Sequence, residues 1–347
     1  MSFSTILGQE GAIRLIRKAL SRHRVPHAYL FTGPEGVGKK LTALTLAKAL
    51  NCLEASGDAC DACKSCNKID SGNHPDVGVI EADGQFIKIG QVRELQKQVS
   101  YKPFEGRRKV FILNDAEKLN LEAANALLKT LEEPPPETLF ILVTSNPEAL
   151  LPTILSRCQP IRFSTLGRDR LRQFILEKKP TALPKVHLLV ALSEGRPGRA
   201  LSIDEDKIST LREQVVELMD LLLSNDQKYP GGSLTPSRMR VLFQKIEEFA
   251  RDRDATEELL DFLLLFYRDL LILSEQGSPH SLTNQDMIPR LGGYLGRVAS
   301  PQILKICQDI YQTKANLQHN ANLQLALEGM FLKIVERSVQ AKAGACF

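Results

Sequence analysis

The feature that most constrains the fold is a series of short apolar runs, separated by segments of helical periodicity, in residues 1–165. Within each run the apolar residues are consecutive instead of alternating with polar ones, which is typical of strands covered on both faces. The pattern predicts an α/β domain in which helices flank a parallel sheet. The expected strands are residues 28–32, 77–82, 109–113 and 139–145, with a short fifth strand at 160–163.

The remaining sequence has helical periodicity only. From about Leu166 no strand pattern occurs, so we predict a small helical domain at 166–206 and a second all-helical domain at 207–347. A chain of 347 residues has room for two or three domains. In the first domain, residues 120–133 are expected to form a helix that Asn120 caps and that three prolines end, namely Pro134, Pro135 and Pro136.

The segment FTGPEGVGKK follows the first expected strand and begins an expected helix. It contains the G-x-x-x-x-G-K pattern of a phosphate-binding loop at Gly33, Gly38 and Lys39, with a further glycine at Gly36. Such a loop wraps backbone N–H groups around a phosphate, and its lysine reaches the β and γ oxygens. The next position should be Ser or Thr, whose hydroxyl binds Mg²⁺, but Lys40 stands there. The alternative is a glycine-rich turn without a ligand.

Asn114 and Asp115 directly follow the third expected strand. In a working P-loop ATPase these positions carry Asp for the metal and, in the motor type, Glu for the attacking water. Asn114 contributes no charge and Asp115 is one methylene shorter than Glu. Changes in both metal-handling motifs predict a nucleotide site that does not hydrolyse ATP.

Four of the seven cysteines lie within fifteen residues, in the spacing C-x₇-C-x₂-C-x₂-C. Four thiolates can close a tetrahedral Zn²⁺ site, and a C-x₂-C turn presents two sulfurs together. We interpret the segment 52–66 as a structural zinc module; four free thiols or an iron–sulfur cluster are the alternatives. The expected ligands are Cys52, Cys60, Cys63 and Cys66.

Two basic features allow both an ordinary and a functional interpretation. Arg157, in SRC after the fourth expected strand, could be a surface residue or an arginine finger that acts on a neighbouring subunit's γ-phosphate. The basic residues from Arg14 to Arg24 could contact nucleic acid, but their spacing favours the solvated face of an amphipathic helix. The net charge of +4 is compatible with nucleic-acid contact without requiring it.

No apolar run approaches the roughly eighteen residues that a membrane span needs. The first twenty residues contain neither the apolar core nor the cleavage site of a secretory signal. We therefore expect a cytoplasmic protein without membrane contact.

Several strings together resemble the delta-prime family of bacterial DNA polymerase III clamp-loader subunits, which are AAA+ proteins. They are ILGQ, HAYLFTGPEGVGKK, the four cysteines, ANALLKTLEEPPPETLFILVTSNPEALLPTILSRCQPIRF, EGRPGRAL and NANLQLALEGMFLKI, and they extend from about Thr5 to Ile334. The resemblance implies an AAA+ domain at 1–165, a helical lid at 166–206 and a helical collar at 207–347. It also implies a zinc module after the P-loop helix and a role for Arg157 as an arginine finger in trans.

The resemblance further implies a five-membered ring with gamma/tau and delta subunits, which places a sliding clamp on primed DNA. The gamma/tau subunits that hydrolyse ATP have Thr or Ser at Lys40, Asp-Glu at Asn114 and Asp115, and a sensor arginine at Gly198. These departures favour a non-hydrolysing, stator-like subunit, and they leave open whether the pocket binds ATP. The alternatives are an active motor subunit of the gamma/tau type and a P-loop kinase for a small molecule.

Overall fold

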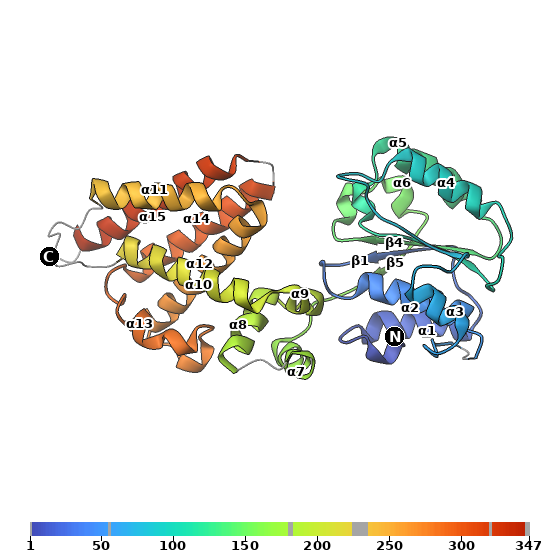
Figure 1. The fold of residues 1–347 in the computed structure, drawn as a ribbon, viewed down its shortest axis with the longest axis horizontal. Helices are drawn as coiled ribbons and strands as arrows, with labels where there is room; N and C mark the ends of the chain where they lie inside the picture. Colours follow the sequence, from blue (N-terminus) through green and yellow to red (C-terminus); the bar gives the residue numbers. More distant parts are fainter. Residues whose placement is uncertain (1, 55–56, 180–182, 224–234, 319–320, 344–347) are drawn as a thin grey trace. The chain divides into compact units, whose positions relative to one another are not determined.

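The structure is a computed structural model that describes residues 2–54, 57–179, 183–223, 235–318 and 321–343 (Figure 1). Residues 55–56 of the predicted zinc module lie outside the described residues. Within the described ranges, no helix has the length and apolar character that crossing a membrane requires.

A parallel sheet of five strands forms the centre of the first unit. Its strands lie in the order β2-β3-β4-β1-β5, and their registers bring Leu30 opposite Leu142 and Ile112 opposite Ile141. The expected parallel sheet is thereby confirmed, with strand ends within two residues of those predicted. The strands are β1 (Ala28–Thr32), β2 (Val77–Ile80), β3 (Lys109–Leu113), β4 (Thr138–Thr144) and β5 (Gln159–Arg162).

Successive residues of each central strand enter two different cores. On β1, Tyr29 and Phe31 join the core on one face, whereas Ala28 and Leu30 join the core on the other. Helices cover both faces, so side chains on either side of these strands are buried, and this explains the unbroken apolar runs. One layer contains α1 (Glu10–Ser21), α2 (Lys39–Asn51) and α3 (Lys64–Asp70); the other contains α4 (Ile89–Val99), α5 (Leu121–Glu132) and α6 (Pro152–Leu155) (Figure 1).

The ends of α5 follow the local sequence rules. The Asn120 side chain accepts a hydrogen bond from the Ala123 N–H at 2.8 Å, as expected of an N-cap. The helix ends at Glu132, and the three prolines follow within four residues. Asn120 and the three prolines therefore determine where α5, the helix before β4, begins and ends.

The chain divides into two compact units. The first is Met1–Leu171 with Gly195–Arg199, and the second is Arg172–Glu194 with Ala200–Phe347. In the described residues beyond β5 the regular elements are helical: α7 (Arg168–Lys178), α8 (Leu183–Ser193), α9 (Pro197–Ser202), α10 (Glu205–Leu223), α11 (Pro236–Phe249), α12 (Arg253–Ser274), α13 (Ile288–Gly292), α14 (Ser300–Gln318) and α15 (Leu323–Ala343). In the second unit, α12 and α15 both pack on α14. A lid at 166–206 and a collar at 207–347 remain predictions.

Candidate functional site

The phosphate-loop sequence forms the turn between β1 and α2, at the carboxyl edge of the sheet. Gly33, Gly36 and Gly38 all have positive φ angles, of 142°, 78° and 100°. A Cβ at Gly33 would lie 2.3 Å from the backbone oxygen of Phe163, so this position accepts only glycine. The turn therefore has the backbone conformation of a loop that curls around a ligand at a helix N-terminus.

Lys39 lies inside this loop and contacts the loop's own backbone. Its ammonium Nζ donates hydrogen bonds to the carbonyl oxygens of Gly33, at 2.5 Å, and Pro34, at 2.7 Å. Burial lowers the pKa of Lys39, although nearby carboxylates, chiefly Glu117, oppose this shift. A phosphate that enters the loop would offer the Lys39 ammonium anionic oxygen acceptors in place of these two neutral carbonyls.

The Lys40 side chain contacts a carboxylate directly after β2. Its Nζ lies 2.6 Å from Oε1 of Glu81, which follows β2, and the same oxygen accepts a hydrogen bond from the Asn114 amide at 3.5 Å. Lys40, Glu81 and Asn114 are thus adjacent at the sheet edge, where P-loop enzymes hold Mg²⁺. Glu81 was not among the site residues expected from the sequence. Its place directly after β2, the strand beside β3, is a signal that could have identified it.

Asp115 and Glu117 lie in the turn after β3. Asp115 has a left-handed backbone, with φ of 52°, and forms an ion pair with Lys118 at 3.3 Å. Glu117 accepts hydrogen bonds from the Ser145 N–H at 3.0 Å and its hydroxyl at 2.5 Å. Burial would raise the pKa of Glu117, but these hydrogen bonds outweigh it and the net shift is downward. Glu117, another residue that the motif comparison missed, therefore stays ionised near Lys39.

The first turn of α9 packs directly against the phosphate loop. The Gly198 N–H donates to the Gly36 carbonyl at 2.8 Å, and a Cβ at Gly198 would lie 2.9 Å from that same oxygen. A side chain at position 198 would force the two backbones apart, because the obstructing atom is backbone. The glycine at this position permits the close approach.

Arg157 lies just after α6 and is about one-third exposed. Its guanidinium lies 2.6 Å from the Glu132 carboxylate at the end of α5, and it donates to the Thr153 carbonyl at 2.8 Å. The ion pair with Glu132 is exposed to solvent. Exposed ion pairs of this kind contribute little to stability. Breaking this ion pair would therefore cost little stability.

The four cysteines predicted as ligands come together, and their sulfur atoms all lie within 4.8 Å of one another. Cys63 is the N-cap of α3: its sulfur accepts the Cys66 N–H at 3.5 Å, and the Cys60 sulfur accepts the Cys63 N–H at 3.3 Å. Burial alone would raise the pKa of Cys63, but backbone N–H donors lower it to about 6. Burial raises the pKa of Cys66 to about 12, so it is the convergence of the four sulfur atoms that fits a metal ion.

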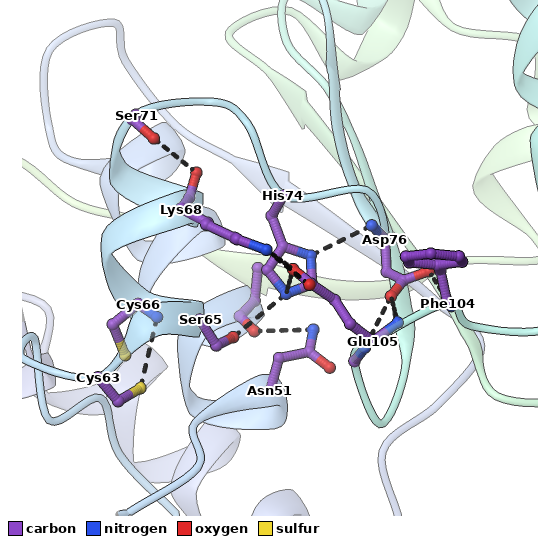
Figure 2. A network of polar contacts seen from close by, with 12 residues as sticks. Asn51, Cys63, Ser65, Cys66, Lys68, Ser71, His74, Asp76, Phe104 and Glu105 are labelled. Atoms are coloured by element: carbon purple, nitrogen blue, oxygen red, sulfur yellow. Dashed lines mark hydrogen bonds and ion pairs between the residues drawn. The ribbon is translucent and has the colours of Figure 1, made fainter.

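A polar network joins α3 to the sheet and to the loop before β3, as Figure 2 shows. Ser65, between the cysteines, lies 3.2 Å from Nε2 of buried His74, whose Nδ1 accepts the Asp76 N–H at 3.1 Å. The Asp76 carboxylate in turn accepts backbone hydrogen bonds from Phe104, Glu105 and Gly106 at 2.7–2.9 Å. The cysteine cluster is therefore anchored to the sheet instead of forming a free appendage.

A parallel sheet in the order β2-β3-β4-β1-β5, with a phosphate loop after β1, defines a P-loop protein of the AAA+ class. Family comparisons are more specific. A family model described as DNA polymerase III, delta subunit matches residues 8–167, and one described as DNA polymerase III, delta subunit, C terminal matches residues 238–336.

Known relatives agree with these matches. The chain is 31% identical over 333 residues to DNA polymerase III subunit delta' of Bacillus subtilis, covering 94% of this chain and 96% of the relative. It is 39% identical over 204 residues to the delta' subunit of Pseudomonas aeruginosa, covering 57% and 61% of the two chains. The tau subunit of Escherichia coli matches at 34% identity over 298 residues, or 82% of this chain and 45% of tau. The chain belongs to the DNA polymerase III delta-prime family.

Proposed function

We propose that this chain is a non-hydrolysing, stator-like subunit of a DNA polymerase III clamp loader. The observation that carries the proposal is the contact between Lys40 and Glu81 where a P-loop enzyme would bind Mg²⁺. A lysine ammonium there contributes positive charge but no ligand atom for a metal, and Asn114 supplies no carboxylate. Hydrolysis of ATP needs the metal to neutralise charge on the β and γ phosphates.

In this proposal the subunit joins gamma/tau and delta subunits in a five-membered ring in the cytoplasm. The ring would place a sliding clamp on primed DNA at the expense of ATP bound by its other members. Membership of the delta-prime family supports this assignment. The phosphate loop would be a retained fold element that can bind phosphate through Lys39 without turning ATP over.

Arg157 is the residue that we propose acts on a neighbour. A guanidinium has a rigid fork of donors that matches phosphate oxygens and remains charged at working pH. Its partner Glu132 is on the same chain and exposed, so exchanging this carboxylate for a neighbour's γ-phosphate would cost little. The chain would then contribute to catalysis although its own site does not.

We also propose that Cys52, Cys60, Cys63 and Cys66 hold a structural Zn²⁺. Four sulfur donors fit zinc and leave no open coordination position for catalysis. The anchoring of α3 through Ser65 and His74 supports a structural role, because it connects the metal site to the sheet.

Similarity to tau favours the second candidate, an active motor subunit. Steady-state ATP turnover of the isolated chain separates the two. We expect background turnover only; turnover of about 1 s⁻¹ or more that Lys39→Ala abolishes would establish the motor instead. Assembly with partner subunits, followed by size analysis, would separate both candidates from a small-molecule kinase.

A further inference from the structure

A groove of about 650 Å³ lies at the amino edge of the sheet, the opposite edge from the phosphate loop. Its lining comes from segments far apart in sequence: the end of α1 and the following turn, the end of α2, and the loop before β3. The apolar residues of the lining are Leu20, Val25, Ala49 and Leu50. This groove is not part of the nucleotide site or of the cysteine cluster.

The groove is positively charged. Three arginines and one histidine line it, against a single carboxylate among the described lining residues: Arg17, His23, Arg107, Arg108 and Glu137. Arg17 forms an ion pair with Asp58 at 2.9 Å. The side chains of Arg107 and Arg108 have no hydrogen bond or ion pair with any residue that the structure describes. Two unpaired guanidinium groups in a concave surface attract an anion.

The loop that supplies these arginines also carries two exposed aromatic side chains. Tyr101 is 71% exposed and Phe104 is 85% exposed, so most of each ring is available to a ligand. Phe104 is three residues from Arg107, and a chain of that length spans at most about 11 Å. Aromatic rings and unpaired cations therefore occur together on one short loop.

The loop is held in place from beneath. Its Phe104, Glu105 and Gly106 N–H groups donate hydrogen bonds to the Asp76 carboxylate. Figure 2 labels Asp76, Phe104 and Glu105 of this set. The Arg108 N–H donates to the buried Asn51 side chain at 2.9 Å, and Asn51 donates back to the Arg108 carbonyl at 3.0 Å. A loop fixed in this way loses little conformational entropy when a ligand binds.

We propose that the groove and the loop 101–108 together form a binding surface for single-stranded nucleic acid. Phosphates would contact Arg17, Arg107 and Arg108, and unpaired bases would stack on Tyr101 and Phe104. Cationic grooves beside aromatic rings are the general means of binding single strands, because every base has a face that can stack. An acidic peptide would use the arginines but not the rings. The proposal does not depend on the chain's role in ATP turnover.

The test is fluorescence anisotropy of a fluorescein-labelled 20-mer of oligothymidylate titrated with the full chain at several salt concentrations. Arg107→Ala/Arg108→Ala should weaken binding at least tenfold and reduce the salt slope by about 1.4, since each phosphate contact on a single strand contributes about 0.7. Phe104→Ala should weaken binding by roughly tenfold without changing the slope, because stacking releases no counterions.

Matched controls are exposed residues on α14 and α15. Lys305→Ala/Lys333→Ala removes two charges and Leu325→Ala removes an exposed apolar side chain; both should bind like wild type. Circular dichroism and thermal unfolding establish that each variant is folded. The proposal is wrong if wild type does not bind at low salt, or if the control pair weakens binding as much as the arginine pair. It is also wrong if Phe104→Ala impairs only association with partner subunits, which would make the loop a protein-docking surface.

Discussion

The ammonium of Lys40 lies 2.6 Å from the carboxylate of Glu81, two residues that are 41 positions apart. They meet because the start of α2, after β1, and the end of β2 both lie at the carboxyl edge of the sheet, where the Lys40 side chain reaches Glu81. The pair occupies the region where a P-loop enzyme would place a metal ion between nucleotide and protein.

The first prediction follows from this pair. Wild-type protein should bind ATP no more tightly with Mg²⁺ than with EDTA, because Lys40 and Asn114 provide neither the hydroxyl nor the carboxylate that the metal needs. Lys40→Thr/Asn114→Asp should introduce a preference for Mg²⁺ of about tenfold or more, or roughly 1.4 kcal/mol. Isothermal titration calorimetry measures both, with Lys39→Ala in the same background as the control that loses binding. A strong Mg²⁺ preference in wild type would contradict our view of the site.

The second prediction concerns Arg157. Arg157→Ala should leave the fold and ring assembly intact, because the side chain is at the surface and its ion pair with Glu132 is exposed. Arginine fingers supplied in trans raise turnover by roughly 10³-fold or more at one site, and the effect on a ring with several sites should be smaller. The measurement is ATP turnover of the reconstituted loader with clamp and primed DNA.

Two further variants make this test specific. Arg157→Lys should also slow turnover, since an ammonium lacks the fork geometry, whereas Glu132→Gln should not slow it. Unchanged rates with Arg157→Ala would make Arg157 an ordinary surface residue.

The third prediction concerns the cysteine cluster. Purified metal-replete protein should contain one zinc per chain by elemental analysis, and Cys63→Ser should lose most of it, because Cys63 is both a ligand and the cap of α3. The sheet should remain folded in this variant, since the four sulfurs belong to one local segment. Cys307→Ser, at a half-buried cysteine of α14, should retain full zinc. Clearly less than one zinc in wild type would exclude the site.

The fourth prediction is a pH dependence of stability from Asp76. Burial would raise the pKa of this carboxyl, but three backbone N–H donors outweigh burial and the net pKa is lowered. Because the folded pKa is below the unfolded one, the stabilisation is complete above the unfolded pKa of about 4 and is lost as pH falls through the folded pKa. Asp76→Asn should cost roughly 3 kcal/mol at pH 7, since hydrogen bonds to charged groups contribute about 1.5–3 kcal/mol each and an amide keeps only some of them.

Urea unfolding followed by far-UV circular dichroism at pH 7 and pH 3 measures this difference. The difference in the free energy of unfolding between wild type and Asp76→Asn should be smaller at pH 3 than at pH 7. Asp83→Asn, at an exposed carboxylate paired with Lys88, should change stability little at either pH. An equal difference in unfolding free energy at both pH values would show that Asp76 stabilises the loop without ionising.

Much of the fold could be predicted because its determinants are local. Apolar runs without alternation identified the strands, and Asn120 with three prolines set the ends of α5. The cysteines could be grouped from spacing alone, since a C-x₂-C turn brings two sulfurs together whatever the rest of the chain does. Lys40 and Asn114 stand where the P-loop motifs have metal-binding side chains, so the expected loss of Mg²⁺ binding could be inferred without knowing any contact.

The partners of these residues could not be found in the same way. No local sequence pattern connects Lys40 with Glu81 or Gly198 with Gly36. Position 198 needs a glycine because the backbone of Gly36, 162 residues earlier, lies against it. The parallel sheet brings Lys40 and Glu81 to one edge, because parallel strands place all their carboxyl ends together. The packing of α9 on the phosphate loop brings Gly198 to Gly36.

The basic residues also illustrate the difference between what the sequence predicts and what the tertiary structure determines. From sequence, the arginines of α1 belong to a solvated helical face, and that interpretation is sound for an isolated amphipathic helix. The sheet places the loop before β3 beside the end of α1, so Arg107 and Arg108 line the same groove as Arg17. The sequence by itself determined which residues are charged and which elements carry them. The tertiary structure decided which charges share a surface, because that depends on long-range packing and strand order instead of on neighbours along the chain.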